Sequence, residues 1–79
     1  MMTPAQSRMA RAALNLTISD LSGMANVAPN TISRFEAEKT APIPATIAVL
    51  RAALESAGVI FIAENGDGPG VRLRKDTEA

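Results

Sequence analysis

The chain of 79 residues is expected to form one small domain with a modest core, without room for a second domain. It contains no cysteine and no histidine, which excludes disulfide frameworks, zinc fingers and catalysis by a thiol or an imidazole. Eight basic and eight acidic residues give a formal net charge of zero, so attraction to nucleic acid has to come from local charge.

The longest uninterrupted apolar run, Val59 to Ala63, is too short to span a membrane, and Met1 to Ala10 lacks the apolar core of a signal peptide. We therefore expect a cytoplasmic protein with no membrane partner. No metal ion, cofactor or small-molecule ligand is expected. An enzyme that uses aspartate or glutamate with a metal has little support, because the acidic residues show no converging ligand spacing.

The first predicted helix covers Pro4 to Asn15 and serves as scaffold. Its basic residues, Arg8 and Arg11, are expected nearer the exposed side. The expected packing side carries apolar side chains, namely Met9, Ala12, Ala13 and Leu16.

Two short helices joined by a tight turn are predicted between Thr17 and Phe35. Thr17 and Asp20 have the spacing of a capping box, which predicts a helix start at Thr17. Asn26 tolerates the left-handed backbone that ends a helix. The inner face between these two points is expected to consist of Leu21, Met24 and Ala25.

The second of the two helices is predicted to begin at Pro29, because a proline at the first position gives up no hydrogen bond. Ile32 and Phe35 supply its inward face. The residues left facing outward are polar: Asn30, Thr31, Ser33 and Arg34. Asparagine can bridge the edge of adenine, and arginine can bridge guanine or hold a phosphate. A short polar helix behind a tight turn is a device for contacting bases in the major groove of DNA.

The stretch from Ser7 to Ala57 resembles the XRE family of small bacterial regulators, which are lambda repressor and Cro-like helix-turn-helix domains. The resemblance is carried by four segments: A-R-A-A-L-N-L at 10–16, D-L at 20–21, N-T-I-S-R-F-E at 30–36 and K-T-A-P at 39–42. It implies a mainly α fold, a compact four-helix domain, and sequence-specific binding to double-stranded DNA.

The resemblance also implies roles for individual residues. Arg11 and Glu36 would form an ion pair that fixes the recognition helix against the first helix. Lys39 and Thr40 fit a loop at the phosphate backbone and an ordinary polar loop equally well. The complete set of expected DNA contacts is Thr17, Ile18, Ala28, Pro29, Asn30, Thr31, Ser33, Arg34, Lys39 and Thr40.

Three positions depart from the family pattern. Ile18 stands where the family usually has a glutamine that contacts DNA. Asn26 replaces the glycine of the turn, which the backbone tolerates. Glu38 replaces the glycine that commonly follows the recognition helix, and an acid near phosphates is unfavourable.

After the motif, Ala41-Pro-Ile-Pro is predicted to be a rigid connector. A longer helix is predicted from Pro44 through Ala57, and Gly58 ends it. Arg51 and Glu55 lie four residues apart on its outer side, as a weak surface pair. The inner face of this helix is expected to carry Ile47, Leu50 and Leu54.

The tail predicts a β-hairpin, because an apolar β-type run at Val59 to Ala63 is followed by a glycine-rich turn and then by Val71-Arg-Leu-Arg. We expect residues 1–58 to form the helix-turn-helix domain, residues 59–75 the hairpin and residues 76–79 a disordered tail. So apolar a strand invites pairing with another chain, although folding back onto its own helices stays open. The expected dimer contacts are Val59, Ile60, Phe61, Ile62, Val71 and Leu73.

The sequence thus predicts a transcriptional regulator without enzymatic activity, a homodimer on an inverted-repeat operator. Repression is the default, and contact with RNA polymerase is compatible with the sequence. The alternative is a protein-binding module, antiactivator-like or antitoxin-like, that has lost DNA affinity and sequesters another protein. Zero net charge, Ile18 and Glu38 favour this alternative.

Overall fold

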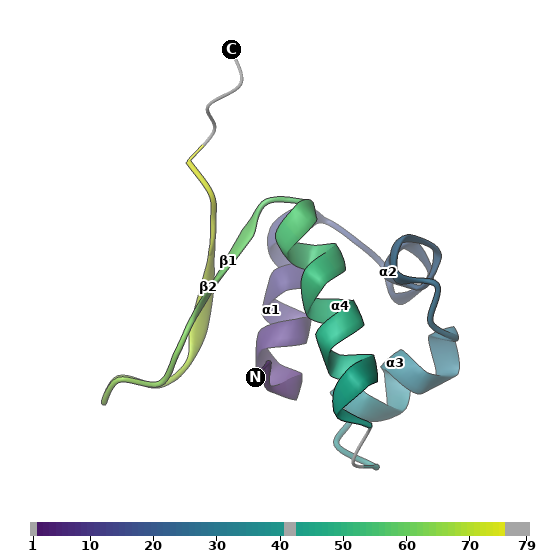
Figure 1. Ribbon diagram of the computed structural model, residues 1–79. Coiled ribbons are helices and arrows are strands. Elements are labelled where there is room, and N and C mark those ends of the chain that lie inside the picture. Colours follow the sequence, from purple (N-terminus) through teal and green to yellow (C-terminus); the bar gives the residue numbers. More distant parts are fainter. Residues whose placement is uncertain (1, 41–42, 76–79) are drawn as a thin grey trace.

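The computed structural model describes residues 2–40 and 43–75. Helices precede one antiparallel hairpin (Figure 1), in the order α1 (Pro4–Leu14), α2 (Ile18–Ala25), α3 (Pro29–Glu36), α4 (Pro44–Ser56), β1 (Val59–Ile62) and β2 (Gly70–Leu73). The predicted mainly helical fold with a C-terminal hairpin is confirmed. The first half of the predicted connector, residues 41–42, and the predicted disordered tail, residues 76–79, lie outside the described residues.

Short polar motifs set where the first helices begin. The Thr17 hydroxyl accepts a hydrogen bond from the Asp20 N–H, and the Asp20 carboxylate accepts one from the Thr17 N–H, each at 2.9 Å. Thr3 and Gln6 form the same kind of capping box before α1. The predicted start of α2 is confirmed, and α3 and α4 each begin at a proline.

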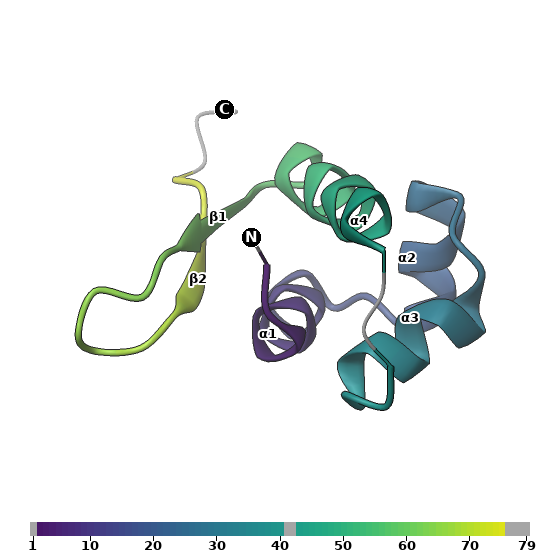
Figure 2. The ribbon, with the colours of Figure 1, turned by 60° about the horizontal axis from the view of Figure 1, so that its bottom comes forward.

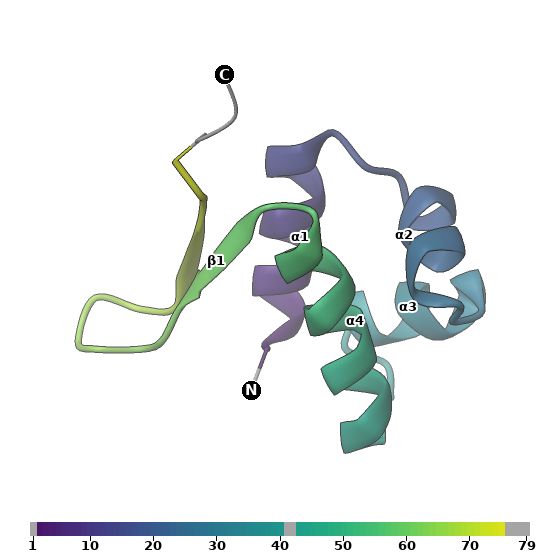
Figure 3. The same cartoon turned by 45° about the horizontal axis from the view of Figure 1, so that its top comes forward.

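The core is formed by one face of each helix together with Met2, which precedes α1, and the first residue of the hairpin. It consists of Met2, Ala10, Leu21, Ala25, Ile32, Phe35, Ile47, Leu50, Leu54 and Val59. Every residue predicted to face inward from α3 and α4 belongs to this set. Figure 3 shows α2 and α3 on the side of the helical body that faces away from the hairpin.

The packing side predicted for α1 is wrong. Met9 is 37% exposed. Ala12 and Ala13 are also exposed, and only Leu16, beyond the end of the helix, packs against the core. The residues of α1 that are buried are Gln6, Ser7 and Ala10. Buried polar groups are tolerated when they are hydrogen-bonded, and both Gln6 and Ser7 have partners, which an apolar pattern does not reveal. In α2, Met24 is likewise 45% exposed, so the inner face is narrower than predicted.

The hairpin folds back onto the helices of its own chain. Val59 pairs with Leu73 and Phe61 with Val71, and three of these side chains, all except Leu73, pack on the core. The Gln6 amide of α1 donates to the carbonyls of Ile62 and Gly70, each at 3.0 Å. Both α1 and α4 lie on one side of the hairpin (Figures 1 and 2).

This packing corrects one of the expected dimer contacts. The Val59 side chain is only 2% exposed within its own chain, so a second chain cannot reach it. Its position follows from Gly58, whose φ of 114° turns the chain directly from α4 into β1. Burial of this apolar side chain in the core is favourable, and it anchors the start of the hairpin.

Candidate nucleic-acid interface

The turn between α2 and α3 is held by backbone and side-chain hydrogen bonds. Asn26 adopts the expected left-handed conformation, with φ 57° and ψ 43°. The Val27 N–H donates to the Ser22 carbonyl at 3.3 Å, and the Ser22 hydroxyl donates to the Val27 carbonyl at 2.6 Å. These contacts fix the direction in which α3 leaves α2.

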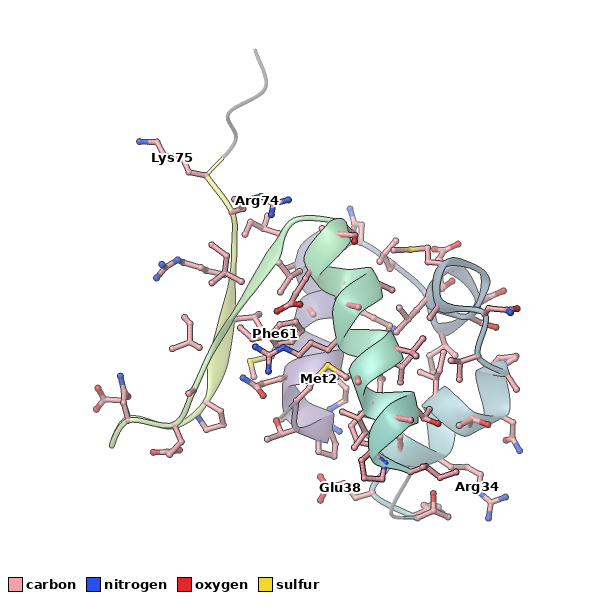
Figure 4. The ribbon with its side chains drawn as sticks, in the orientation of Figure 1. Met2, Arg34, Glu38, Phe61, Arg74 and Lys75 are labelled. Atoms are coloured by element: carbon pink, nitrogen blue, oxygen red, sulfur yellow. The ribbon has the colours of Figure 1, made fainter. Side chains whose placement is uncertain are left out.

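Helix α3 presents a polar face to solvent. Ile32, Phe35 and Glu36 are buried on its inner side. The outward orientation predicted for the remaining polar residues is observed, since Asn30, Thr31, Ser33 and Arg34 are all exposed. Figure 4 shows Arg34 extending away from the body of the molecule. A helix with free amide, hydroxyl and guanidinium groups on one face can present hydrogen-bond partners to the base edges of a major groove.

The start of α2 offers mainly backbone donors. Thr17 is exposed, but its hydroxyl is engaged in the capping box. Hydrogen bonds from the Thr17 N–H, and then from its hydroxyl, lower the pKa of Asp20. The cap is therefore complete at neutral pH and is lost only as the pH falls through this lowered pKa. The N–H groups of the first turn, at Ile18 and Ser19, have no earlier carbonyl of the helix to bond.

Three predicted contacts can act only through the main chain or by permitting close approach. The Ile18 side chain packs against the core and is half-buried, because burial of its apolar surface is favourable. Its backbone N–H is the group that remains for a phosphate. Ala28 and Pro29 are exposed at the start of α3, where the small alanine and the ring without an N–H allow a close approach to DNA.

A buried carboxylate joins α1 to the end of α3. Glu36 is 4% exposed, and Arg11 contacts it through two hydrogen bonds, Nε to Oε2 at 2.8 Å and Nη2 to Oε1 at 2.5 Å. The Ser7 hydroxyl donates to the same Oε2 at 2.7 Å. Arg11 also donates to the Leu16 carbonyl at 3.1 Å, and Arg8 donates to the Glu36 main-chain carbonyl. The hydrogen bond to Glu36 raises the pKa of Arg11, so the guanidinium keeps its positive charge.

This network contains the expected ion pair between Arg11 and Glu36. It also contains Ser7 and Arg8, whose contacts with Glu36 the sequence did not reveal. Ser7 lies four residues before Arg11, on the same face of α1, and this spacing is the signal that could have identified it. Among the described residues, no buried side-chain polar atom lacks a hydrogen-bond partner. The network fixes the end of α3, while Arg34, two residues before Glu36 and on the opposite side of the helix, is exposed to solvent.

Helix α3 ends with a residue in an unfavourable conformation. Glu38 has φ 60°, and its N–H donates to the Phe35 carbonyl while the Lys39 N–H donates to the Arg34 carbonyl, each at 3.0 Å. This pattern is a Schellman motif, in which glycine is the favoured residue at the left-handed position. Lys39 and Thr40 follow it and are exposed.

Replacing this residue with glycine is expected to stabilise the fold. Glu38→Gly relieves the left-handed strain and should raise the free energy of unfolding by about 1 kcal/mol. The matched control is Glu38→Gln, which removes the charge and keeps the Cβ atom, and it should leave the urea midpoint close to that of the parent. Equal stabilisation by both variants would show that charge, and not backbone strain, is the cause.

The charges around the exposed face nearly cancel. Arg34 and Lys39 are exposed cations, while Asp20 and Glu38 are exposed acids. Glu36 is neutralised by Arg11 and adds nothing to the outer field. Binding to nucleic acid through this face would therefore depend on specific hydrogen bonds more than on long-range attraction.

The remaining chemistry of the described residues is sparse. No group of three or more acidic, cysteine or histidine side chains among them could hold a metal ion. None of their helices is both long enough and apolar enough to cross a membrane.

Comparison with known proteins agrees with this geometry. A family model described as helix-turn-helix matches residues 8–57, which span α1 from Arg8 onward and the whole of α2, α3 and α4. No similar protein was found among curated proteins.

Proposed function

Because the chain belongs to the XRE-type helix-turn-helix family, whose members are DNA-binding regulators, we propose that it is a sequence-specific transcriptional regulator. The observation that carries this proposal is the exposed polar face of α3, held rigidly behind a capped turn. In the proposed complex Asn30, Ser33 and Arg34 contact base edges, and the N–H groups that start α2 contact phosphates.

The active species in this proposal is a homodimer on an inverted-repeat operator. Paired recognition helices place half-sites about 34 Å apart, one turn of DNA, unless the dimer imposes another spacing. The default action is repression, by covering the site where RNA polymerase binds, and activation by direct contact with polymerase is the other mode open to so small a protein. The proposed location is the cytoplasm, where the protein controls its own gene through its own concentration.

The experiment is a fluorescence anisotropy titration of labelled DNA taken from immediately upstream of the protein's own gene. A scrambled duplex serves as the control, and two salt concentrations are used. We expect tight binding to the native duplex alone. With Lys39 of each protomer at a phosphate, the logarithm of affinity should fall with that of salt at a slope of about −2. Binding with no preference for the native duplex would contradict an autoregulatory operator.

A second candidate function is a protein-binding module that sequesters another protein. Two observations favour it: the near cancellation of charge around α3, and an exposed face of α4 without charge, made of Ala45, Ala48, Val49 and Ala52. An apolar protein interface responds little to salt, whereas DNA binding weakens steeply. Capture of one partner protein at high salt, without any DNA preference, would support this candidate over the first.

A further inference from the structure

Strand β2 has a free edge with unused main-chain groups. Within the described residues the sheet has two strands, so no third strand pairs with β2. The Arg74 N–H donates to the Gly58 carbonyl at 2.6 Å, which fixes the alternation of the antiparallel ladder. It follows that the N–H and C=O groups of Val71 and Leu73 point away from β1, along the free edge.

Strand β1 lies near a charged pair on α4. Helix α4 packs beside β1, and the Arg51 guanidinium lies 4.9 Å from the centre of the Phe61 ring. The same Arg51 forms the predicted pair with Glu55, Nε to Oε2 at 3.0 Å. A strand added along β1 would therefore lie near this charged pair, whereas neither ion pair of the described residues involves β2.

The charges on β2 and on the residues that flank it differ between its two ends. The C-terminal half carries three exposed cations, Arg72, Arg74 and Lys75. The segment before Val71 has glycine and proline but no cation, and the turn carries the acids Glu64 and Asp67. When two copies of this strand run antiparallel, the cationic half of each one lies opposite the neutral and acidic half of the other.

We propose that a second copy of this chain pairs antiparallel along the free edge of β2, about a two-fold axis at Val71. This inference rests on the proposed homodimer and specifies how it is built. In this register Val71 lies opposite its own copy, Arg72 lies opposite the partner's Gly70, and the Leu73 N–H meets the partner's Pro69 carbonyl. Pro69 has no N–H, so the ladder ends there.

Like-charge repulsion disfavours the two registers centred further toward the C-terminus. A register centred on Arg72 places two guanidinium groups directly opposite each other, and one centred on Leu73 places Arg72 opposite Arg74 twice. Like charges directly opposite in a sheet are destabilising. The Val71-centred register avoids both of these like-charge contacts. In it, each Arg72 lies opposite a Gly70, which has no side chain.

Gly70 has no conformational reason to be glycine within one chain. Its φ is not in the left-handed region, and a Cβ added there would meet no atom within 4 Å. The proposed dimer gives the residue a function, because it makes room for the partner's Arg72. The same fact makes position 70 a safe place to introduce test residues.

The register can be tested by disulfide cross-linking of the full chain, which contains no cysteine of its own. In an antiparallel pair the positions opposite each other have Cα atoms about 4.5–5.5 Å apart, within disulfide reach. A mixture of the Gly70→Cys and Arg72→Cys chains should therefore form a heterodimer faster than either chain forms a homodimer. Faster cross-linking of Arg72→Cys with itself would overturn the proposed register.

A charge test uses the same position without cysteine. Gly70→Lys places a cation opposite the partner's Arg72 twice per dimer and should raise the dissociation constant of the dimer roughly tenfold, measured by sedimentation equilibrium. Gly70→Glu is the matched control and should strengthen the dimer. Equal dimer affinity of both variants and the parent, or a dimer without cross-links, would place the contact elsewhere, for example on the exposed face of α4.

Failure of this inference can be distinguished from failure of the proposed function. The same preparations are titrated with operator DNA by anisotropy. Operator binding by a dimer that does not cross-link overturns the β2 interface and leaves the regulator intact. Cross-linking as expected, without any DNA preference, supports the interface and contradicts the DNA-binding function.

Discussion

Replacing Arg11 with alanine is expected to lower the free energy of unfolding by about 3 kcal/mol, the largest effect we expect of a single substitution. The variant leaves the Glu36 carboxylate buried without its counter-ion, and only the Ser7 hydroxyl still donates to it. The Arg11 side chain is 19% exposed, which puts the effect at the low end of the range for buried pairs. Urea denaturation followed by circular dichroism measures the change.

The control removes both charges together. The double variant Arg11→Met, Glu36→Gln keeps similar volumes and leaves no uncompensated charge, so it should recover much of the lost stability. DNA binding by Arg11→Ala should weaken only because the end of α3 loses its anchor. An unchanged melting temperature in Arg11→Ala would show that the ion pair does not position α3.

Replacing Arg34 with alanine is expected to cost about 1–3 kcal/mol of specific DNA binding and to leave the fold intact. Arg34 is exposed on α3 and forms no salt bridge among the described residues, so its loss removes no packing. Anisotropy titration against the operator and the scrambled duplex measures the loss, and the melting temperature reports on the fold.

Lys75→Ala is the matched control for this second prediction. Figure 4 shows Lys75 at the opposite end of the molecule from Arg34, with the same unit of charge. Its removal should change operator affinity little, since it lies far from the proposed groove. If Arg34→Ala binds the operator as tightly as the parent, or if both variants lose equal affinity, Arg34 does not contact bases.

Local chemistry made the motif predictable. A hydroxyl and a carboxylate three residues apart specify the start of α2, and proline specifies the start of α3. Asn26 takes the left-handed conformation that ends α2. Within α3 the spacing of apolar and polar residues places Ile32 and Phe35 on one side of the helix, which is buried, and the polar residues on the other. Each of these signals lies within a few residues, where sequence and conformation are directly coupled.

Tertiary partners decided what local chemistry could not. The packing side of α1 follows Gln6 and Ser7, whose hydrogen-bond partners come from the hairpin and from Glu36, far along the chain. A polar residue is predicted to be exposed unless its hydrogen-bond partner is known. Val59 was expected at a dimer contact for the same reason, because an apolar strand gives no indication of which surface will cover it.

Helix α3 is proposed to read a DNA sequence as one half of a symmetric dimer. Selection of bound duplexes from a random pool, followed by sequencing, tests this recognition and does not require that the operator sequence be known. We expect an enriched inverted repeat, with a base preference in each half-site that relaxes in the Arg34→Ala variant. A pool that stays random after repeated rounds, with protein that is folded and dimeric, would contradict DNA reading by α3.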